Sequence, residues 1–272
     1  EIDMRSIAWG AAASLALVAT AGPALAQDDS QVSVLHAVPG LTVDVYVNGE
    51  ETLPDFEPGT LTDPLTLPAG DYDIELYAAG ADPESEDPAI SAEGLAVPGG
   101  ANLTLTANLD ADGNPALNAF VNDTSTLDAG QARLTVRHTA AAPAVDIRAG
   151  GSPVIEGLTN PNEEVLNLDA GTVTADVTLA GTEDVAIGPA DLDLTEGTNT
   201  IVYAWGSAAD GNLDLAVQTI DGLHGDPSGV PTGDGGLLEG GSAAWLWVLG
   251  AAGVAGALVA GRKLTAQGGH AA

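Results

Sequence analysis

Two histidines stand at matching places in the chain, and each is followed eight residues later by an aspartate. His36 precedes Asp44, and His138 precedes Asp146. An imidazole beside a carboxylate can act as an acid–base pair or supply two ligands to a metal ion. A metal site usually needs three or more ligands, and no second histidine stands nearby in either case. Because each histidine is in phase with apolar neighbours, we favour a structural role, in which a buried imidazole hydrogen-bonds across a hairpin with the aspartate as candidate partner.

Oxygen-bearing side chains at alternate positions offer a second kind of chemistry. Asp110, Asp112 and Asn114 resemble the first half of a calcium-binding loop, because such side chains converge on a hard cation. The matching run, Ala208 to Asn212, lacks the first of these ligands, and neither run supplies the later glutamate of such a loop. An Asp-Gly pair is also a strong hairpin-turn signal. We therefore favour a turn, with these three residues as weak calcium candidates.

Few aromatic side chains are available to stack on a sugar ring. Tyr203 and Trp205 are the main candidates, and Tyr46, Tyr72 and Tyr77 are the others. For catalysis no candidate emerges, because the sequence has no cysteine, no Gly-x-Ser-x-Gly elbow, no His-Glu-x-x-His motif and no phosphate-binding glycine loop. We expect no enzymatic activity and no cofactor.

The charge of the chain restricts its partners. It carries 39 acidic residues against six basic ones, a net charge of −33. Between Arg5 and Arg262 the only basic residues are Arg133, Arg137 and Arg148. Such a field repels nucleic acid and attracts cations without specificity, so nucleic-acid binding is not expected. The composition resembles that of proteins from salt-loving, halophilic organisms, and an ordinary acidic secreted surface is the alternative.

An internal repeat organises the chain. The segment VSVLHAVPGLTVDVYVNG, which starts at Val32, matches LTVRHTAAAPAVDIRAGG, which starts at Leu134, and the match aligns both histidines and both aspartates. Two tandem domains are therefore expected, at residues 30–126 and 131–222.

Each copy of the repeat has the pattern of β-strands. Val43, Val45 and Val47 alternate with polar residues and fall on one side of a strand, as period two requires. Turn signals such as Asn48-Gly49 separate the apolar runs. The pattern predicts an all-β fold of two tandem immunoglobulin-like antiparallel β-sandwich domains.

The opening of the repeat resembles a known family. The run LHAVPGLTVDVYVNG from Leu35 is similar to the start of the domain of unknown function 4397 (DUF4397), a bacterial and archaeal envelope family. The second copy keeps the histidine, a downstream Pro143 and the Val-Asp-Ile core, but has Arg148 where the first has Tyr46. The resemblance implies two tandem β domains on an exported, membrane-anchored protein, and it implies no established activity.

Segments outside the repeat predict the location. Residues 4–26 have the charged start, apolar stretch and Ala-x-Ala site of a signal peptide. Residues 243–261 carry no charge and are long enough, at ~1.5 Å per residue, to cross the ~30 Å hydrocarbon core as a transmembrane helix. The basic pair Arg262-Lys263 puts the tail, residues 262–272, in the cytoplasm.

The segment before this helix is a predicted tether. Residues 223–242 are rich in glycine and proline and show no apolar periodicity, which favours a flexible linker. Within it, Val230-Pro231-Thr232-Gly233 resembles part of a sortase signal but lacks the Leu-Pro-x-Thr-Gly spacing. Membrane anchoring is therefore favoured, and transfer to the cell wall is the alternative.

These observations predict a single-pass protein of the plasma membrane with most of the chain extracellular. We expect a non-enzymatic cell-surface protein that displays two β domains for adhesion or envelope contacts with an unidentified envelope or extracellular partner. The alternative is a ligand-binding module for carbohydrate or calcium at the cell surface. A hydrolase with an unrecognised carboxylate pair is the third and least favoured hypothesis.

Overall fold

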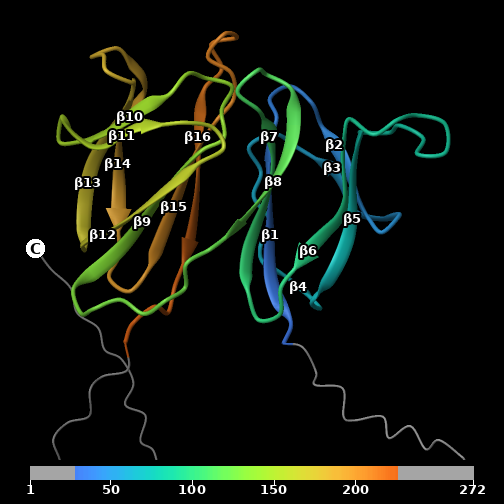
Figure 1. Cartoon of the computed structure of the whole chain (residues 1–272), viewed down its shortest axis with the longest axis horizontal. Helices are drawn as coiled ribbons and strands as arrows, with labels where there is room; N and C mark the ends of the chain where they lie inside the picture. The colour runs from blue at the N-terminus through green and yellow to red at the C-terminus, as the bar shows by residue number, and fades with distance from the viewer. Residues whose placement is uncertain (1–27, 226–272) are drawn as a thin grey trace, which may run out of the picture. The chain divides into compact units, whose positions relative to one another are not determined.

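The computed structural model describes residues 28–225 (Figure 1). The predicted signal peptide, membrane span, tail and nearly all of the tether lie outside these residues. Every regular element among the described residues is a β-strand. A search of this part of the chain finds no helix with the length and hydropathy of a membrane span.

The first eight strands form two four-stranded sheets, which together we name lobe 1. The strand orders are β4-β1-β7-β8 and β3-β2-β5-β6. The bounds of the strands are β1 Ser30–Ala37, β2 Val43–Val47, β3 Glu50–Phe56, β4 Leu65–Leu67, β5 Gly70–Ala78, β6 Ile90–Val97, β7 Asn102–Leu109 and β8 Pro115–Val121.

The next eight strands form lobe 2, and their order repeats that of lobe 1. The sheets run β12-β9-β15-β16 and β11-β10-β13-β14, so each strand takes the place of the strand numbered eight lower. The all-β prediction is confirmed, and the four-stranded sheets are consistent with β-sandwich domains. The bounds are β9 Gln131–His138, β10 Val145–Ala149, β11 Ser152–Leu158, β12 Glu163–Asp169, β13 Gly171–Leu179, β14 Val185–Leu194, β15 Asn199–Trp205 and β16 Asp214–Ile220.

Alternation and turn chemistry place the strands as the sequence predicts. Val43 and Val45 of β2 are 0% and 3% exposed and face the core of lobe 1. Between β2 and β3, Asn48 and Gly49 have φ values of 52° and 79°. Two successive residues with positive φ give the turn whose twist matches that of the flanking strands, and only residues such as Asn and Gly adopt it at low cost.

The direction of two strand pairs differs from the prediction. β1 pairs with β7 in parallel, and β9 pairs with β15 in parallel, so the sheets that contain them are mixed and not wholly antiparallel. A parallel pair requires a crossover connection. Here the crossover exists because the chain forms the strands of the facing sheet after the first strand of the pair and before the second. Alternation shows which face of a strand is buried, but it carries no information about the direction of the neighbour.

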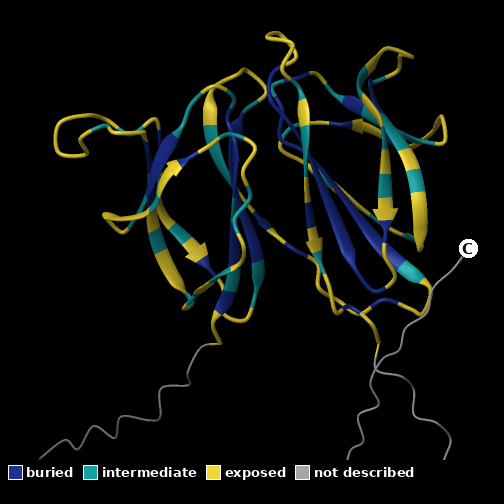
Figure 2. Ribbon diagram, turned by 180° about the vertical axis from the view of Figure 1, so that it is seen from behind, coloured by how far each residue is buried: buried dark blue, intermediate teal, exposed yellow. Residues whose placement is uncertain are grey.

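Each lobe has its own apolar core between its two sheets, and the burial pattern is drawn in Figure 2. In each lobe, the sheet that contains β1 or β15 is also buried on the face that points away from this core. Leu35 and Ala37 of β1 share a third cluster with Ile201, Tyr203 and Trp205 of β15. The two lobes therefore meet through the sheets β4-β1-β7-β8 and β12-β9-β15-β16.

The chain stays packed on lobe 2 slightly beyond the predicted end of the domain at residue 222. Leu223 is 4% exposed, accepts a hydrogen bond from the backbone N–H of Leu127 and donates to the carbonyl of Gly197. A Cβ added at Gly197 would clash with the ring of His224. The connection after β8 and the last described residues are thus fixed against each other.

Candidate functional site

The imidazole of His36 is fully buried and held by backbone groups. Its Nε2 donates to the carbonyl of Leu41 at 2.6 Å, its Nδ1 accepts from the N–H of Val38 at 3.5 Å, and its ring stacks on Phe56. One nitrogen donates and the other accepts, which is the arrangement of a neutral imidazole. Burial lowers the pKa of His36, against the opposing effect of the Leu41 carbonyl.

His138 repeats this arrangement in lobe 2. Its Nε2 donates to the carbonyl of Pro143 at 3.0 Å, and its Nδ1 accepts from the N–H of Ala140 at 3.4 Å. Burial lowers the pKa of His138 as well. The structure therefore places both histidines in backbone-satisfied core positions.

The two aspartates bind backbone N–H groups and not the histidines. The carboxylate of Asp44 accepts from the N–H of Asp55 at 2.7 Å and from that of Gly80 at 2.9 Å. In lobe 2 the carboxylate of Asp146 accepts from Gly157 and Gly181, both at 2.7 Å, and these bonds lower its pKa. The predicted hydrogen bond between each histidine and its aspartate is therefore not formed. The histidine and the aspartate instead bind separate backbone groups, and each joins neighbouring strands and loops.

Asp110 closes the turn between β7 and β8. Its carboxylate accepts from the backbone N–H groups of Asp112 at 2.9 Å and Asn114 at 2.8 Å, and the bonds from Asn114 lower its pKa. Asp112 and Asn114 lie in the same exposed turn. Within residues 28–225 no group of three or more His, Cys, Asp or Glu side chains is arranged to hold a metal ion.

The two aromatic stacking candidates lie between the lobes. Tyr203 is 0% exposed and Trp205 is 8% exposed, so neither ring presents a face to solvent in this structure. Trp205 packs close to Gly59 of lobe 1, where an added Cβ would lie 3.1 Å from the indole. Stacking of a sugar on these two rings would require the lobes to separate.

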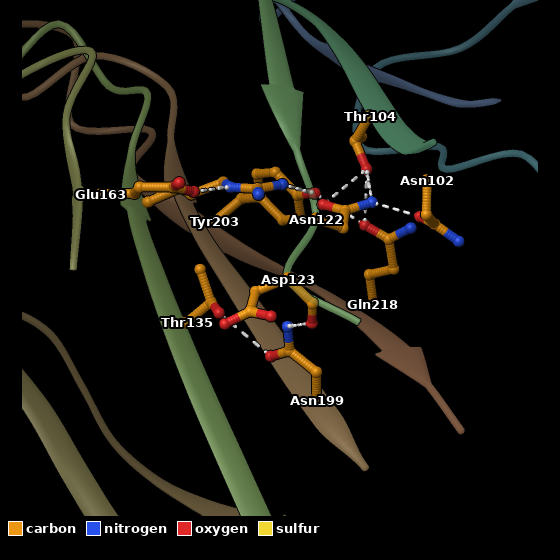
Figure 3. Close-up of polar contacts among 10 residues, drawn as sticks. Asn102, Thr104, Asn122, Asp123, Thr135, Glu163, Asn199, Tyr203 and Gln218 are labelled. Carbon is orange, nitrogen blue, oxygen red and sulfur yellow. Dashed lines mark hydrogen bonds and ion pairs between the residues drawn. The ribbon is translucent and has the colours of Figure 1, made fainter. Parts of the chain in front are cut away.

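A chain of buried polar groups crosses this contact, and most of it is shown in Figure 3. Arg137 of β9 is 1% exposed; its Nε donates to Glu163 at 2.6 Å and its Nη1 donates to the hydroxyl of Tyr203 at 2.7 Å. The guanidinium also lies over the ring of Phe120 of lobe 1, 4.4 Å from its centre, as in a cation–π contact. A charged side chain of lobe 2 therefore packs against an aromatic ring of lobe 1.

The same chain of hydrogen bonds continues into lobe 1. The hydroxyl of Tyr203 donates to Oε1 of Gln218 at 2.7 Å, and Thr104 donates to the same oxygen at 2.9 Å. Nδ2 of Asn122 donates to Thr104 at 3.1 Å and to Oδ1 of Asn102 at 2.6 Å. We name these residues the interlobe network: Asn102, Thr104, Asn122, Arg137, Glu163, Tyr203 and Gln218.

Arg133 holds the connection between the lobes. It is 3% exposed, and its Nη1 lies 3.0 Å both from the carboxylate of Asp123 and from the carbonyl of the same residue. The same nitrogen also donates to the carbonyl of Ser125, while Nη2 donates to the hydroxyl of Ser125 and Nε donates to Oδ1 of Asn167. The third arginine, Arg148, pairs with Asp176 and Glu183, so all three arginines of the described residues are engaged within the chain.

A polar groove of about 370 Å³ opens beside the interlobe network. Lobe 1 lines it with residues 61–64, Ser33 and Asn102, and lobe 2 lines it with residues 217–221. None of the sequence-predicted site residues lies in it. One signal in the sequence points to its surroundings: β1, β7, β9 and β15 contain no Asp or Glu, although the chain has 39 of them. Strands without any acid in so acidic a protein indicate faces that are withdrawn from solvent.

A family model matches part of the chain. Residues 30–148 match the family model described as Domain of unknown function (DUF4397), a span that covers lobe 1 and the strands β9 and β10 of lobe 2. No curated protein matches the chain. The family resemblance is thus supported for the first copy and for the start of the second.

Proposed function

We propose, on the premise that residues 30–148 match the DUF4397 family, that the chain is a non-enzymatic cell-surface protein with two tandem, immunoglobulin-like copies of this domain. A signal peptide at residues 4–26 exports it, and a helix at residues 243–261 holds it in the plasma membrane with both lobes outside. The lobes act in adhesion or in contacts with other envelope components.

Lobe 2 has the features expected of a second copy. Its strand order repeats that of lobe 1. His138 and Asp146 make the same kinds of backbone bonds as His36 and Asp44. Repetition of both strand order and buried polar motifs supports duplication of one domain.

The observation that carries the contact function is a long acidic loop of lobe 1, which lobe 2 has only in a shorter form. Residues 79–89, between β5 and β6, project from the sheet in Figure 1 and are largely exposed in Figure 2. Asp82 orders the loop, because its carboxylate accepts from the N–H of Glu84 and the hydroxyl of Ser85, while its own N–H donates to Glu86. The corresponding connection in lobe 2, residues 180–184, is shorter. An ordered, exposed acidic loop suits a contact with a cationic partner surface.

A complementation experiment tests the contact function. Cells that lack the chain should lose adhesion or envelope contacts, and the wild-type chain should restore them. A chain in which residues 180–184 replace residues 79–89 should reach the surface but restore them poorly. Full restoration by this variant would exclude the loop as the contact element.

The location has its own test. Protease added to intact cells should cleave both lobes, and a chain without residues 243–261 should be released into the medium. Protection of the lobes in intact cells, with cleavage only after lysis, would contradict the proposal.

Ligand binding is the second candidate function, and one observation favours it. The groove beside the interlobe network contains polar groups from both lobes. Carbohydrate, the ligand class expected as an alternative from the sequence, is compatible with this polar lining.

A further inference from the structure

The groove between the lobes contains hydrogen-bonding groups that have no partner within the described residues. Gln218 is 7% exposed and lines the groove, and its Oε1 is used by Tyr203 and Thr104 while its Nε2 makes no hydrogen bond with residues 28–225. Asn102 also lines the groove. Its Oδ1 accepts from Asn122, and its Nδ2 likewise makes no hydrogen bond with residues 28–225. Two side-chain amide NH2 groups are therefore available as donors.

The orientation of Gln218 is set by the interlobe network. An arginine only donates, so Tyr203 must accept from Arg137 and must use its single hydrogen toward Gln218. Gln218 consequently presents its oxygen to the tyrosine, and its nitrogen is directed away from it.

The orientation of Asn102 follows from the same rule. Thr104 uses its single hydrogen toward Gln218, and so it accepts from Nδ2 of Asn122. The other hydrogen of that nitrogen goes to Oδ1 of Asn102 (Figure 3). The buried Arg137, which is paired with the partly exposed Glu163, thus orients both amides at the groove.

The groove also contains acceptors and an apolar surface. The carboxylates of Asp63 and Asp221 line it, are exposed and make no hydrogen bond or ion pair with residues 28–225. No basic residue lines it. Val217, which is 49% exposed, supplies apolar surface from the edge strand β16.

These groups select one class of ligand. An anion would be repelled by the two carboxylates, and a simple cation would leave both amide donors without an acceptor. A hydroxyl group both donates and accepts, so a neutral polyhydroxylated molecule satisfies the carboxylates and the amides together. We propose that the interlobe groove binds a neutral saccharide through Asp63, Asn102, Gln218 and Asp221.

This inference deepens and rests on the second candidate function, ligand binding, and is independent of surface display. It also gives the pairing of the lobes a role, since each lobe contributes one carboxylate and one amide. Neither lobe alone would contain the complete set.

The test uses the purified full chain on an array of neutral oligosaccharides. Isothermal titration calorimetry with the neutral disaccharides maltose, cellobiose, lactose and mannobiose then measures affinity, and spermidine is the cationic comparison. Asp63→Asn and Asp221→Asn should each weaken saccharide binding about tenfold or more, because each removes a charged hydrogen-bond acceptor. Glu93→Gln is the matched control: it neutralises an exposed carboxylate on β6, away from the groove, and should leave the affinity unchanged.

Hydrogen exchange locates the site independently. Saccharide should increase the protection of residues 61–64 and 217–221. Absence of binding to every neutral glycan, equal binding by the two Asp→Asn variants and the wild type, or binding of spermidine without any saccharide would each overturn the inference. Any of these results would leave the protease and adhesion readouts of surface display unaffected.

Discussion

Tyr203 has a central place in the contact between the lobes because its hydroxyl links a charge in lobe 2 to the amide of Gln218. It accepts from Arg137 and donates to Gln218, both at 2.7 Å, in surroundings that exclude solvent. Burial raises the pKa of this phenol, against the lowering effect of Arg137. The hydroxyl therefore keeps the proton that it donates.

Removal of that hydroxyl leaves Nη1 of Arg137 without its acceptor and leaves Oε1 of Gln218 with Thr104 as its remaining donor. We expect Tyr203→Phe to lower the free energy of unfolding by about 1–3 kcal/mol, the usual cost of unsatisfied buried polar groups. Urea denaturation of the full chain measures it. Tyr72→Phe is the control, because the hydroxyl of Tyr72 donates to Pro68 at an exposed site and its loss should cost little. Equal effects of the two substitutions would contradict the role given to Tyr203.

His36 and His138 make stability depend on pH. Burial lowers their pKa values in the folded chain, whereas an unfolded histidine titrates near ~6.5. Below that pH the unfolded chain binds more protons, so the melting temperature should fall as the pH drops from about 7.5 toward 5.

Substitution of a histidine separates this effect from that of the carboxylates. His138→Ala should destabilise the fold at pH 7.5, through a cavity and lost backbone bonds, and should flatten the pH dependence. His224→Ala, at an exposed site, is the control substitution of a histidine outside the two cores. An unchanged melting temperature and slope in His138→Ala would argue against a buried neutral imidazole.

At the scale of the strand, β7 is the clearest case of a polar face that is buried. Asn102, Thr104, Thr106 and Asn108 alternate with apolar residues, and the last three are 0% exposed. Alternation of this kind normally marks one face in water. Here the second lobe covers the face, and hydrogen bonds replace water for most of its polar atoms.

Two threonines on this face provide a matched pair. Thr104 bonds to Gln218 and Asn122, whereas the hydroxyl of Thr106 has no partner among the described residues. Thr106→Val should raise the free energy of unfolding, or leave it unchanged, because it removes an unsatisfied polar group with little change of shape. Thr104→Val should lower it by about 1–3 kcal/mol. A greater loss from Thr106→Val than from Thr104→Val would contradict the assigned bonds.

At the scale of the whole molecule, charge is the dominant feature. The net charge is −33, and the three arginines of residues 28–225 are all paired with carboxylates. The surface is therefore acidic with little internal neutralisation, and self-repulsion opposes folding.

Salt should relieve this repulsion. The Debye length falls from ~10 Å at 0.1 M to ~3 Å at 1 M, so the melting temperature of the full chain should rise over this range. Scanning calorimetry in sodium chloride measures the shift, and a potassium chloride series shows that it does not depend on the cation. A melting temperature that stays constant from low to molar salt would contradict the prediction.

The sequence by itself determined the local features of this protein. Alternation identified the buried side of β2, Asn48-Gly49 identified a turn, and the phase of His36 and His138 placed them in the cores. These features depend only on residues that are close together in the sequence. The strand period and the turn geometry that produce them are set by runs of a few residues.

Only the tertiary structure decided what joins distant segments. It set the parallel pairs β1–β7 and β9–β15, the backbone partners of Asp44, and the meeting of Arg137 with Phe120. It also brought Asp63 and Asp221 to one groove. A polar strand face has the same pattern whether water or another lobe covers it, because alternation records that a face is polar and not what satisfies its hydrogen bonds.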